Sequence, residues 1–99
     1  MPKKFSVYIT QSAQNDLEQI FFYIACDNVN KAKKFIIELE EKIYSLDTLT
    51  KRCPYISENN YFGTNYRHLI HKKYRVIYKI VGNSVYILRV VHGAKMLDL

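Results

Sequence analysis

The sequence has few of the residues from which metal centres and disulfide scaffolds are built. Its 99 residues include two cysteines, Cys26 and Cys53, three histidines, three glycines and no tryptophan. Two cysteines make neither a disulfide framework nor a four-cysteine metal site. His68 and His71 are spaced for a strand or turn, where their rings do not converge on one ion. We therefore expect no metal, and the lack of a glycine-rich phosphate loop leads us to expect no cofactor.

Long hydrophobic runs are also missing. No apolar stretch approaches the ~20 residues that a membrane-spanning helix needs, and the first nine residues are too short and too interrupted for a secretory signal. Apolar residues make up 48% of the chain and aromatic residues 14%, which is typical of a globular protein. We expect one domain over residues 1–99, with no membrane contact, in a reducing cytoplasm.

Acidic residues are scarce in the second part of the chain. Residues 1–58 contain eight Lys or Arg and eight Asp or Glu, whereas residues 59–99 contain seven Lys or Arg and one acid, Asp98. The net charge of +6 therefore lies entirely in the second part. Such an imbalance favours an anionic partner, although a basic surface that only keeps the protein soluble remains an alternative.

The first part of the chain has the pattern of a strand and two helices. Residues 5–9 alternate as a short strand does, and Thr10 can cap a helix over residues 11–26. Asn30 can cap a second helix over residues 31–49. Apolar residues recur at the helical period in both; they are Ala13, Leu17, Ile20, Phe21 and Ile24, then Ala32, Phe35, Ile36, Leu39, Ile43, Leu46 and Leu49. Two such helices joined by a short turn predict an antiparallel helical hairpin.

The second part predicts three strands. Residues 50–65 are expected to be a loop, and residues 66–71, 74–81 and 85–92 are dense in Tyr, Val and Ile. Gly82-Asn83 is a favourable turn between the last two strands. The order β-α-α-β-β-β predicts an α+β fold, in which a helical hairpin packs on a small twisted, mainly antiparallel sheet.

The turn at Gly82-Asn83 also predicts the strand register. Tyr78 then pairs with Ile87, and Val76 pairs with Arg89. The face toward the helices carries Val76, Tyr78, Ile80, Val85, Ile87, Arg89 and Val91. The opposite face has an apolar centre of Ile77, Leu88 and Val90, ringed by Arg75, Lys79, Tyr86 and His92. We interpret this opposite face as a partner-binding surface, the alternative being that the loop at 50–65 folds over it.

Arg89 is expected on the helix-facing side of the sheet. A buried Arg needs an anionic or carbonyl partner. We therefore expect it to contact an acidic residue of the helical hairpin or to emerge at the sheet edge.

The basic residues of the second part suggest two chemistries, polyanion binding and metal-free RNA cleavage. Cleavage needs a base for the 2′-hydroxyl, cations on the phosphate and an acid for the leaving oxygen. His92 or a tyrosine could act as acid or base, and Arg67 and Arg75 could stabilise the phosphorane. Tyrosines could stack on bases.

Three segments together resemble the RelE/ParE superfamily of toxins. They are residues 74–80 (YRVIYKI) followed by Gly82-Asn83, residues 85–95 (VYILRVVHGAK), and Ile9-Thr10-x-x-Ala13-x-x-Asp16-Leu17-x-x-Ile20-x-x-Tyr23-Ile24. The resemblance covers nearly the whole chain, and the order of elements agrees with that of the family.

The resemblance implies the toxin of a type II toxin–antitoxin module, such as those that stabilise plasmids. The ending of the last strand in His92-Gly93 and basic residues is closer to the ParE branch, which poisons DNA gyrase without being an enzyme. The alternative is the RelE branch, a ribosome-dependent and metal-independent mRNA endonuclease, although this chain has no tyrosine after the last strand. A non-toxic antitoxin-binding module is a third reading.

The resemblance also implies partners and site residues. We expect a hetero-oligomer with an acidic protein antitoxin, which contacts Ile77, Leu88 and Val90. We expect gyrase, or the ribosome with its mRNA, as the target. The target-binding residues are expected to be Arg75, Lys79, Tyr86, Arg89, His92 and Lys95. Catalysis, if the protein is an RNase, would depend on Arg67, Arg75 and His92.

Overall fold

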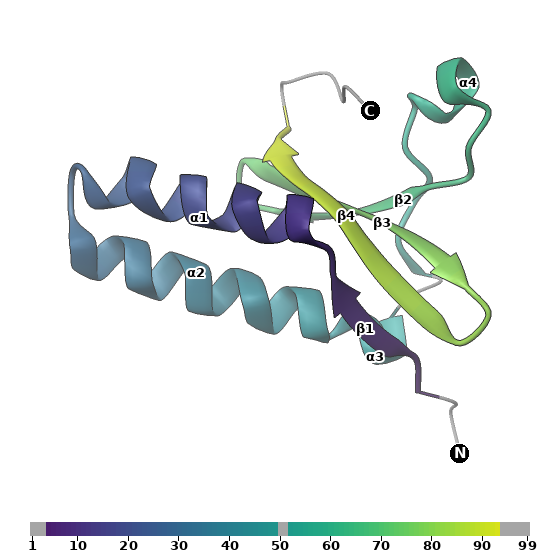
Figure 1. Ribbon diagram of the computed structural model, residues 1–99, viewed down its shortest axis with the longest axis horizontal. Helices are drawn as coiled ribbons and strands as arrows, with labels where there is room; N and C mark the ends of the chain where they lie inside the picture. The colour runs from purple at the N-terminus through teal and green to yellow at the C-terminus, as the bar shows by residue number, and fades with distance from the viewer. Residues whose placement is uncertain (1–3, 50–51, 94–99) are drawn as a thin grey trace.

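The computed structural model describes residues 4–49 and 52–93. The elements, in chain order, are β1 (Ser6–Ile9), α1 (Gln11–Ala25), α2 (Val29–Tyr44), α3 (Leu46–Leu49), α4 (Asn59–Phe62), β2 (Arg67–His71), β3 (Tyr74–Val81) and β4 (Ser84–His92). The predicted α+β fold is confirmed: α1 and α2 form a hairpin that packs against the sheet (Figure 1). No helix in the described part of the chain is long and apolar enough to cross a membrane.

The two long helices begin at capping side chains. Thr10 caps α1 as predicted, since its Oγ1 accepts a hydrogen bond from the Ala13 N–H at 3.3 Å. Asn28 caps α2 through the Lys31 N–H at 3.0 Å, so the prediction that Asn30 is the cap was wrong. The helix predicted over 31–49 is interrupted at Ser45, whose hydroxyl donates back to the Lys42 carbonyl. Such local bonds compete with a regular helix, and the chain continues as the separate α3.

The four strands form one mixed sheet in the order β1-β4-β3-β2. β1 runs parallel to β4, and the other two pairs are antiparallel. Gly82 begins the β3–β4 turn with a φ of 59°, a conformation that glycine adopts without strain. Lys72 takes a φ of 54° in the β2–β3 turn, where a residue with a Cβ pays a cost of about 1–2 kcal/mol.

A β-bulge in β4 changes the predicted register. Tyr78 pairs with Ile87 as expected, but Ile77 pairs with Arg89 and Val76 with Val90, with a register shift between Ile77 and Tyr78. Leu88 is therefore the extra residue on the bulged strand. The predicted pairing of Val76 with Arg89 was wrong. The bulge moves every later residue of β4 to the other face, so the faces assigned to Arg89, Val90, Val91 and His92 were wrong as well.

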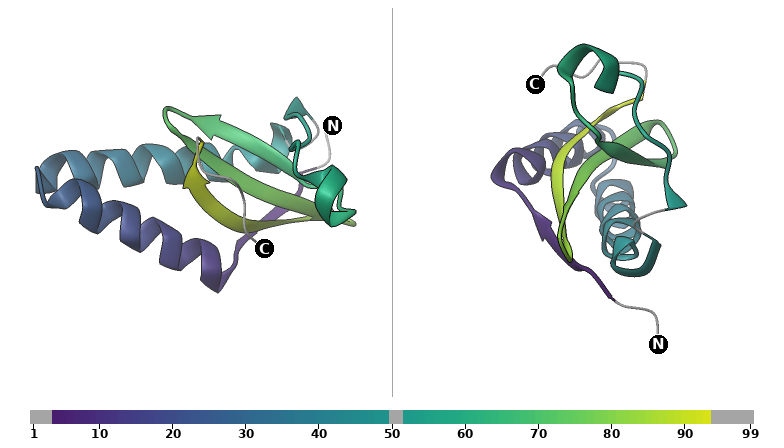
Figure 2. Two further views of the ribbon diagram at one scale, coloured as in Figure 1. Left: turned by 90° about the horizontal axis from the view of Figure 1, so that it is seen from above. Right: turned by 90° about the vertical axis from the view of Figure 1, so that its right-hand side faces the viewer.

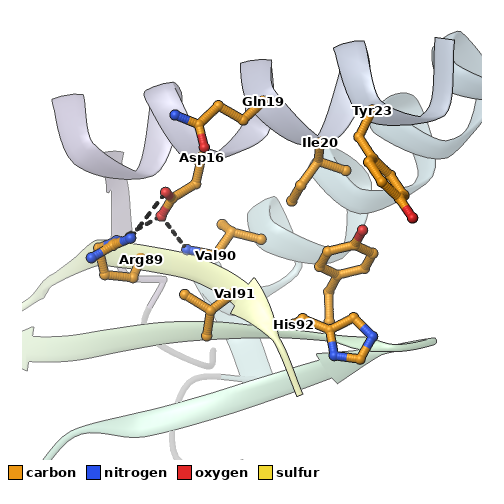
Figure 3. Close-up of a pocket in the computed structure, with 9 residues that line it drawn as sticks. Asp16, Gln19, Ile20, Tyr23, Arg89, Val90, Val91 and His92 are labelled. Carbon is orange, nitrogen blue, oxygen red and sulfur yellow. Dashed lines mark hydrogen bonds and ion pairs between the residues drawn. The ribbon is translucent and has the colours of Figure 1, made fainter. Parts of the chain in front are cut away.

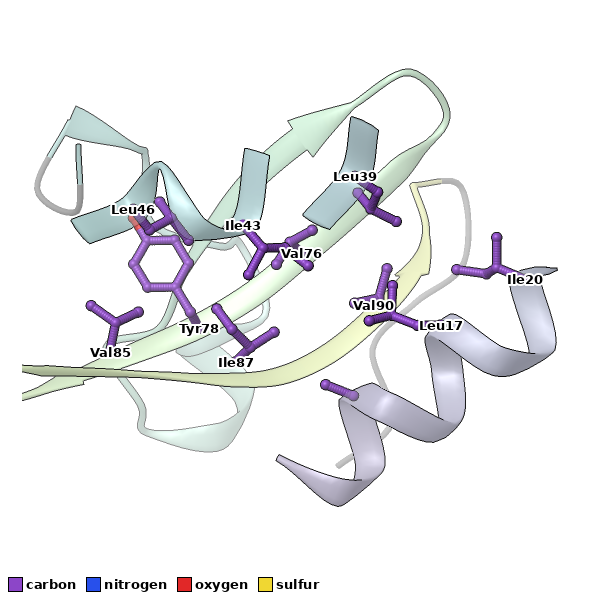
Figure 4. Close-up of a cluster of buried hydrophobic side chains, with 11 residues drawn as sticks. Leu17, Ile20, Leu39, Ile43, Leu46, Val76, Tyr78, Val85, Ile87 and Val90 are labelled. Atoms are coloured by element: carbon purple, nitrogen blue, oxygen red, sulfur yellow. The ribbon is translucent and has the colours of Figure 1, made fainter. Parts of the chain in front are cut away.

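The bulge divides the buried residues into two clusters. The main core lies between the helices and the sheet (Figure 4) and contains Ala13, Leu17, Ile20, Leu39, Ile43, Leu46, Val76, Tyr78, Val85, Ile87 and Val90. A second cluster joins Ile77 and Val91 to Ile56, with Tyr66 packed against it. Because Ile56 belongs to the segment before β2, residues 52–66 cover part of the sheet face that points away from the helices.

That covering segment carries α4 to one end of the molecule. Figures 1 and 2 show α4 projecting at the end opposite the turn between α1 and α2. Residues 50–65 were expected to be a loop, but Asn59–Phe62 within them form the single-turn helix α4.

Candidate functional site

A groove of about 370 Å³ separates α1 from the last residues of β4 (Figure 3). We call it the α1–β4 groove. It is lined by Asp16, Gln19, Ile20, Tyr23, Tyr74, Arg89, Val90, Val91 and His92. Both helical and strand residues contribute because the bulged end of β4 runs directly beside α1. The groove therefore combines apolar, aromatic and charged side chains on one surface.

Asp16 fixes one side of the α1–β4 groove. Its carboxylate accepts from Arg89 Nε at 2.8 Å, from Arg89 Nη2 at 3.2 Å and from the Val90 backbone N–H at 2.9 Å. The Arg89 side chain keeps 33% of its surface exposed. The expectation that Arg89 contacts an acid of the helical hairpin is confirmed. Asp16 itself was not predicted as its partner, although it stands beside the buried Leu17 in the helical stripe.

Aromatic rings form the other side of the α1–β4 groove. The rings of Tyr74 and His92 meet edge to face, with 5.7 Å between their centroids, and Tyr23 is 77% exposed above them. Burial, and secondarily the Tyr23 phenol, raise the pKa of Tyr74. Tyr74 thus remains a neutral phenol at physiological pH. This side of the groove therefore presents a neutral phenol and an imidazole ring beside apolar residues.

Arg75 lies beneath the covering segment and not on an open surface. Its guanidinium donates to both carboxylate oxygens of Glu58, at 2.6 and 3.1 Å, and both side chains are more than 90% buried. A charge removed from water to this degree requires such a partner. Glu58 was not predicted as this partner, because residues 50–65 were expected to be a loop.

Arg67 also holds the covering segment in place. It donates to the Cys53 carbonyl at 2.7 Å and to the Tyr55 hydroxyl at 2.9 Å, and its guanidinium lies 4.1 Å from the centre of the Tyr55 ring. The three residues predicted for RNA cleavage therefore have separate partners. Arg67 binds Cys53 and Tyr55, Arg75 binds Glu58, and His92 contacts Tyr74.

His68 lies close to the Glu58–Arg75 pair. Burial is the main cause that lowers its pKa; Arg75 lowers the pKa further, and Glu58 opposes the change. Its Nδ1 atom is buried without a hydrogen-bond partner. The ring is therefore neutral at pH 7, and it adds no charge to the surface.

Two of the three residues expected to contact an antitoxin are inaccessible. Ile77 is fully buried beneath Ile56, and Val90 is 3% exposed in the main core. Leu88 is partly exposed. The expectation that this whole face is open was wrong, since the covering segment occupies part of it and the bulge turns Val90 toward the helices.

Lys79 and Tyr86 occupy the part of that face outside the second cluster, and both are partly exposed. Tyr86 stacks on Tyr8 with 5.5 Å between ring centroids, and the Lys79 ammonium lies 6.0 Å from the centre of the Tyr86 ring.

Lys95 lies outside the described residues. Within residues 4–49 and 52–93, no group of three His, Cys, Asp or Glu is arranged to hold a metal ion.

Comparisons with known proteins agree with the fold. A family model described as the ParE toxin of the type II toxin–antitoxin system parDE matches residues 7–97. A solved structure of the chromosomal ParDE TA system from P. aeruginosa is similar with a TM-score of 0.72 and 18% identity, over 91% of this chain and 97% of that one. The toxin–antitoxin complex RelBE2 from Mycobacterium tuberculosis is similar with a TM-score of 0.68 and 19% identity, over 90% and 98%. A comparison with curated proteins finds no match.

Proposed function

The chain belongs to the ParE family of toxins of type II toxin–antitoxin systems, and from this premise we propose that it arrests growth by poisoning DNA gyrase in the cytoplasm. The solved structures that it resembles are described as toxin–antitoxin assemblies, which supports a protein antitoxin as its partner. We propose that this antitoxin is acidic, because the second part of the chain carries the whole net charge of +6.

One observation carries the choice of gyrase over RNA cleavage. The two arginines proposed for RNA cleavage make structural contacts. Arg75 forms an ion pair with the buried Glu58, and Arg67 donates hydrogen bonds to Cys53 and Tyr55. A guanidinium that must leave a buried carboxylate to reach a phosphate loses that pairing energy. These contacts support a protein that works by binding and not by acid–base chemistry.

The surface that we propose for target binding contains the accessible cations and rings. Lys79 and Tyr86 lie on the sheet face, and Arg89 and His92 lie in the α1–β4 groove. Lys95 is kept as an expected contact. Arg75 is removed from this set as a direct contact, because its side chain is 9% exposed.

The test combines purified protein with DNA gyrase and supercoiled plasmid. We expect protein-linked linear DNA to accumulate after denaturation of the mixture. Lys79→Ala with Tyr86→Ala should reduce this product, whereas Lys33→Ala, a change of one exposed lysine on α2, should not. Unchanged supercoiling and no linear product at concentrations that arrest growth would contradict the proposal.

The same preparation tests the alternative function. The RelBE2 likeness supports RelE-type cleavage of mRNA as the second candidate. It predicts breaks within codons of an mRNA during translation in vitro, and their loss in His92→Ala. Cleavage by the wild-type protein with gyrase left active would replace our proposal with this one, and growth without arrest would indicate a non-toxic antitoxin-binding module.

A further inference from the structure

Three large aromatic side chains are exposed within eight residues of the covering segment. Tyr55 is 57% exposed, Tyr61 82% and Phe62 40%. We call them the aromatic knob. Tyr61 and Phe62 lie on α4, which projects at the end of the molecule away from the α1–α2 turn (Figures 1 and 2). Single exposed apolar residues need no explanation, but a group on a projection marks an interaction site.

The backbone that carries the aromatic knob is rigidly held. The Asn59 side chain donates to the Tyr66 carbonyl at 2.9 Å and accepts from Thr64 Oγ1 at 2.7 Å and from the Tyr66 N–H at 3.0 Å. Gly63 ends α4 in the left-handed conformation with a φ of 65°. A loop ordered in this way loses little conformational entropy on binding, which favours affinity.

The residues that precede α4 fix the base of the knob to the sheet. Arg67 binds Cys53 and Tyr55, and Ile56 packs on Ile77. Glu58, which immediately precedes α4, pairs with Arg75. A single-turn helix of four residues has little stability of its own. The buried Glu58–Arg75 ion pair therefore helps to fix the position of α4, which carries two exposed aromatic rings.

The charges near the aromatic knob are of one sign. Glu58 is the only acidic residue between 52 and 93, and it is already neutralised by Arg75. The Arg67 guanidinium lies over the Tyr55 ring, 4.1 Å from the ring centre. Electrostatic complementarity thus favours an acidic surface as the partner.

The geometry favours a protein over a nucleic acid. Tyr61 and Phe62 are consecutive on a helix, so their side chains point about 100° apart, and they do not form the parallel platform on which successive bases stack. Rigid aromatic anchors flanked by Arg are instead typical of the residues that dominate protein–protein binding.

We propose that the aromatic knob is a docking element for the target protein, and that it inserts into an apolar pocket with an acidic rim. This inference rests on the proposed function only in that the chain acts on a protein target. It adds a contact separate from both the α1–β4 groove and the Lys79–Tyr86 surface.

The experiment compares Tyr61→Ser and the double variant Tyr61→Ser with Phe62→Ser against wild-type protein. Tyr44→Ser is the matched control, because Tyr44 is an aromatic residue on α2 that is 51% exposed. Binding to immobilised purified gyrase should weaken at least tenfold in the double variant and less in Tyr61→Ser. Urea unfolding should be unchanged, since the replaced side chains are exposed. Equal binding by the double variant and wild type would overturn the inference while leaving the proposed function intact.

Two further measurements separate the possible failures. If wild-type protein does not bind gyrase, the proposed target is wrong, and growth arrest on induction becomes the test of the knob. Arrest that is lost in the double variant and kept in Tyr44→Ser supports the inference, and arrest that persists in the double variant overturns it. Binding of a labelled single-stranded oligonucleotide that depends on Tyr61 and Phe62 would also overturn it, because the partner would then be nucleic acid.

Discussion

Glu58 and Arg75 place opposite charges in a site that water barely reaches. We expect Glu58→Gln to lower the free energy of unfolding by about 3 kcal/mol, because it leaves a buried guanidinium without its counter-charge. Replacing both residues, as Glu58→Leu with Arg75→Met, should recover most of that loss. Urea unfolding measures both effects, with Glu18→Gln on exposed α1 surface as the control. A loss below 1 kcal/mol for Glu58→Gln would show that the pair is not desolvated.

We expect His68 and His71 to make the stability of the protein depend on pH. Burial is the main cause that lowers the pKa of each; Arg75 adds to the effect at His68, and Lys72 at His71. In the unfolded chain the histidine pKa is about 6.5. Between that value and the lowered folded pKa, the unfolded state binds more protons. The stabilisation is therefore complete above pH 6.5 and is lost as the pH falls through 6.5 toward the folded pKa.

The measurement is urea unfolding between pH 5 and 7.5. Wild-type protein should lose stability as the pH falls below 6.5, and the variant with both His68→Gln and His71→Gln should show a flatter profile over the same range. If the two profiles are parallel, other groups cause the pH dependence.

At the scale of single elements, Thr10 links α1 to β4. Its hydroxyl accepts from the Ala13 N–H and donates to the Ile87 carbonyl at 2.6 Å. We expect Thr10→Ala to cost about 1–2 kcal/mol, because both the cap and a partly buried hydrogen bond are lost. Thr10→Ser keeps the hydroxyl and should retain most of the stability in chemical unfolding. Equal losses in the two variants would mean that the methyl group, and not the hydroxyl, is responsible.

Elements with a clear period could be predicted from the sequence, and those decided by tertiary contacts could not. The apolar stripe of α1 and the Gly82-Asn83 turn led to the correct helix and hairpin. The bulge at Leu88 leaves no mark on residue spacing, so a strict two-residue alternation placed Val90 and Val91 on the wrong faces.

The candidate site could be predicted less well than the fold for a similar reason. Arg89 was expected to need an acid, but which acid depends on how α1 lies along β4. Arg75 was taken as a surface cation because nothing local shows that Glu58, 17 residues earlier, folds over it. Charge pairs between distant segments are properties of the packing and not of the local sequence.

At the scale of the whole molecule, the positive charge is distributed unevenly along the chain. Residues 59–93 contain six Lys or Arg and no acid. We expect the association rate with an acidic antitoxin to fall as salt is raised, while the dissociation rate changes little, because apolar contacts also hold the complex. Stopped-flow mixing at several ionic strengths measures both rates. A salt dependence as steep as that of nucleic-acid binding would show that the attraction is purely ionic.

The parallel pairing of β1 with β4 has a consequence for how the protein comes into being. Ser6 lies opposite Ser84, so β1 cannot join the sheet until β4, which comes much later in the chain, is available. Contacts between such distant segments form late and slowly. The sheet therefore stays incomplete until β4 has been synthesised, and the addition of β1 to the edge of β4 is expected to be a late step of folding.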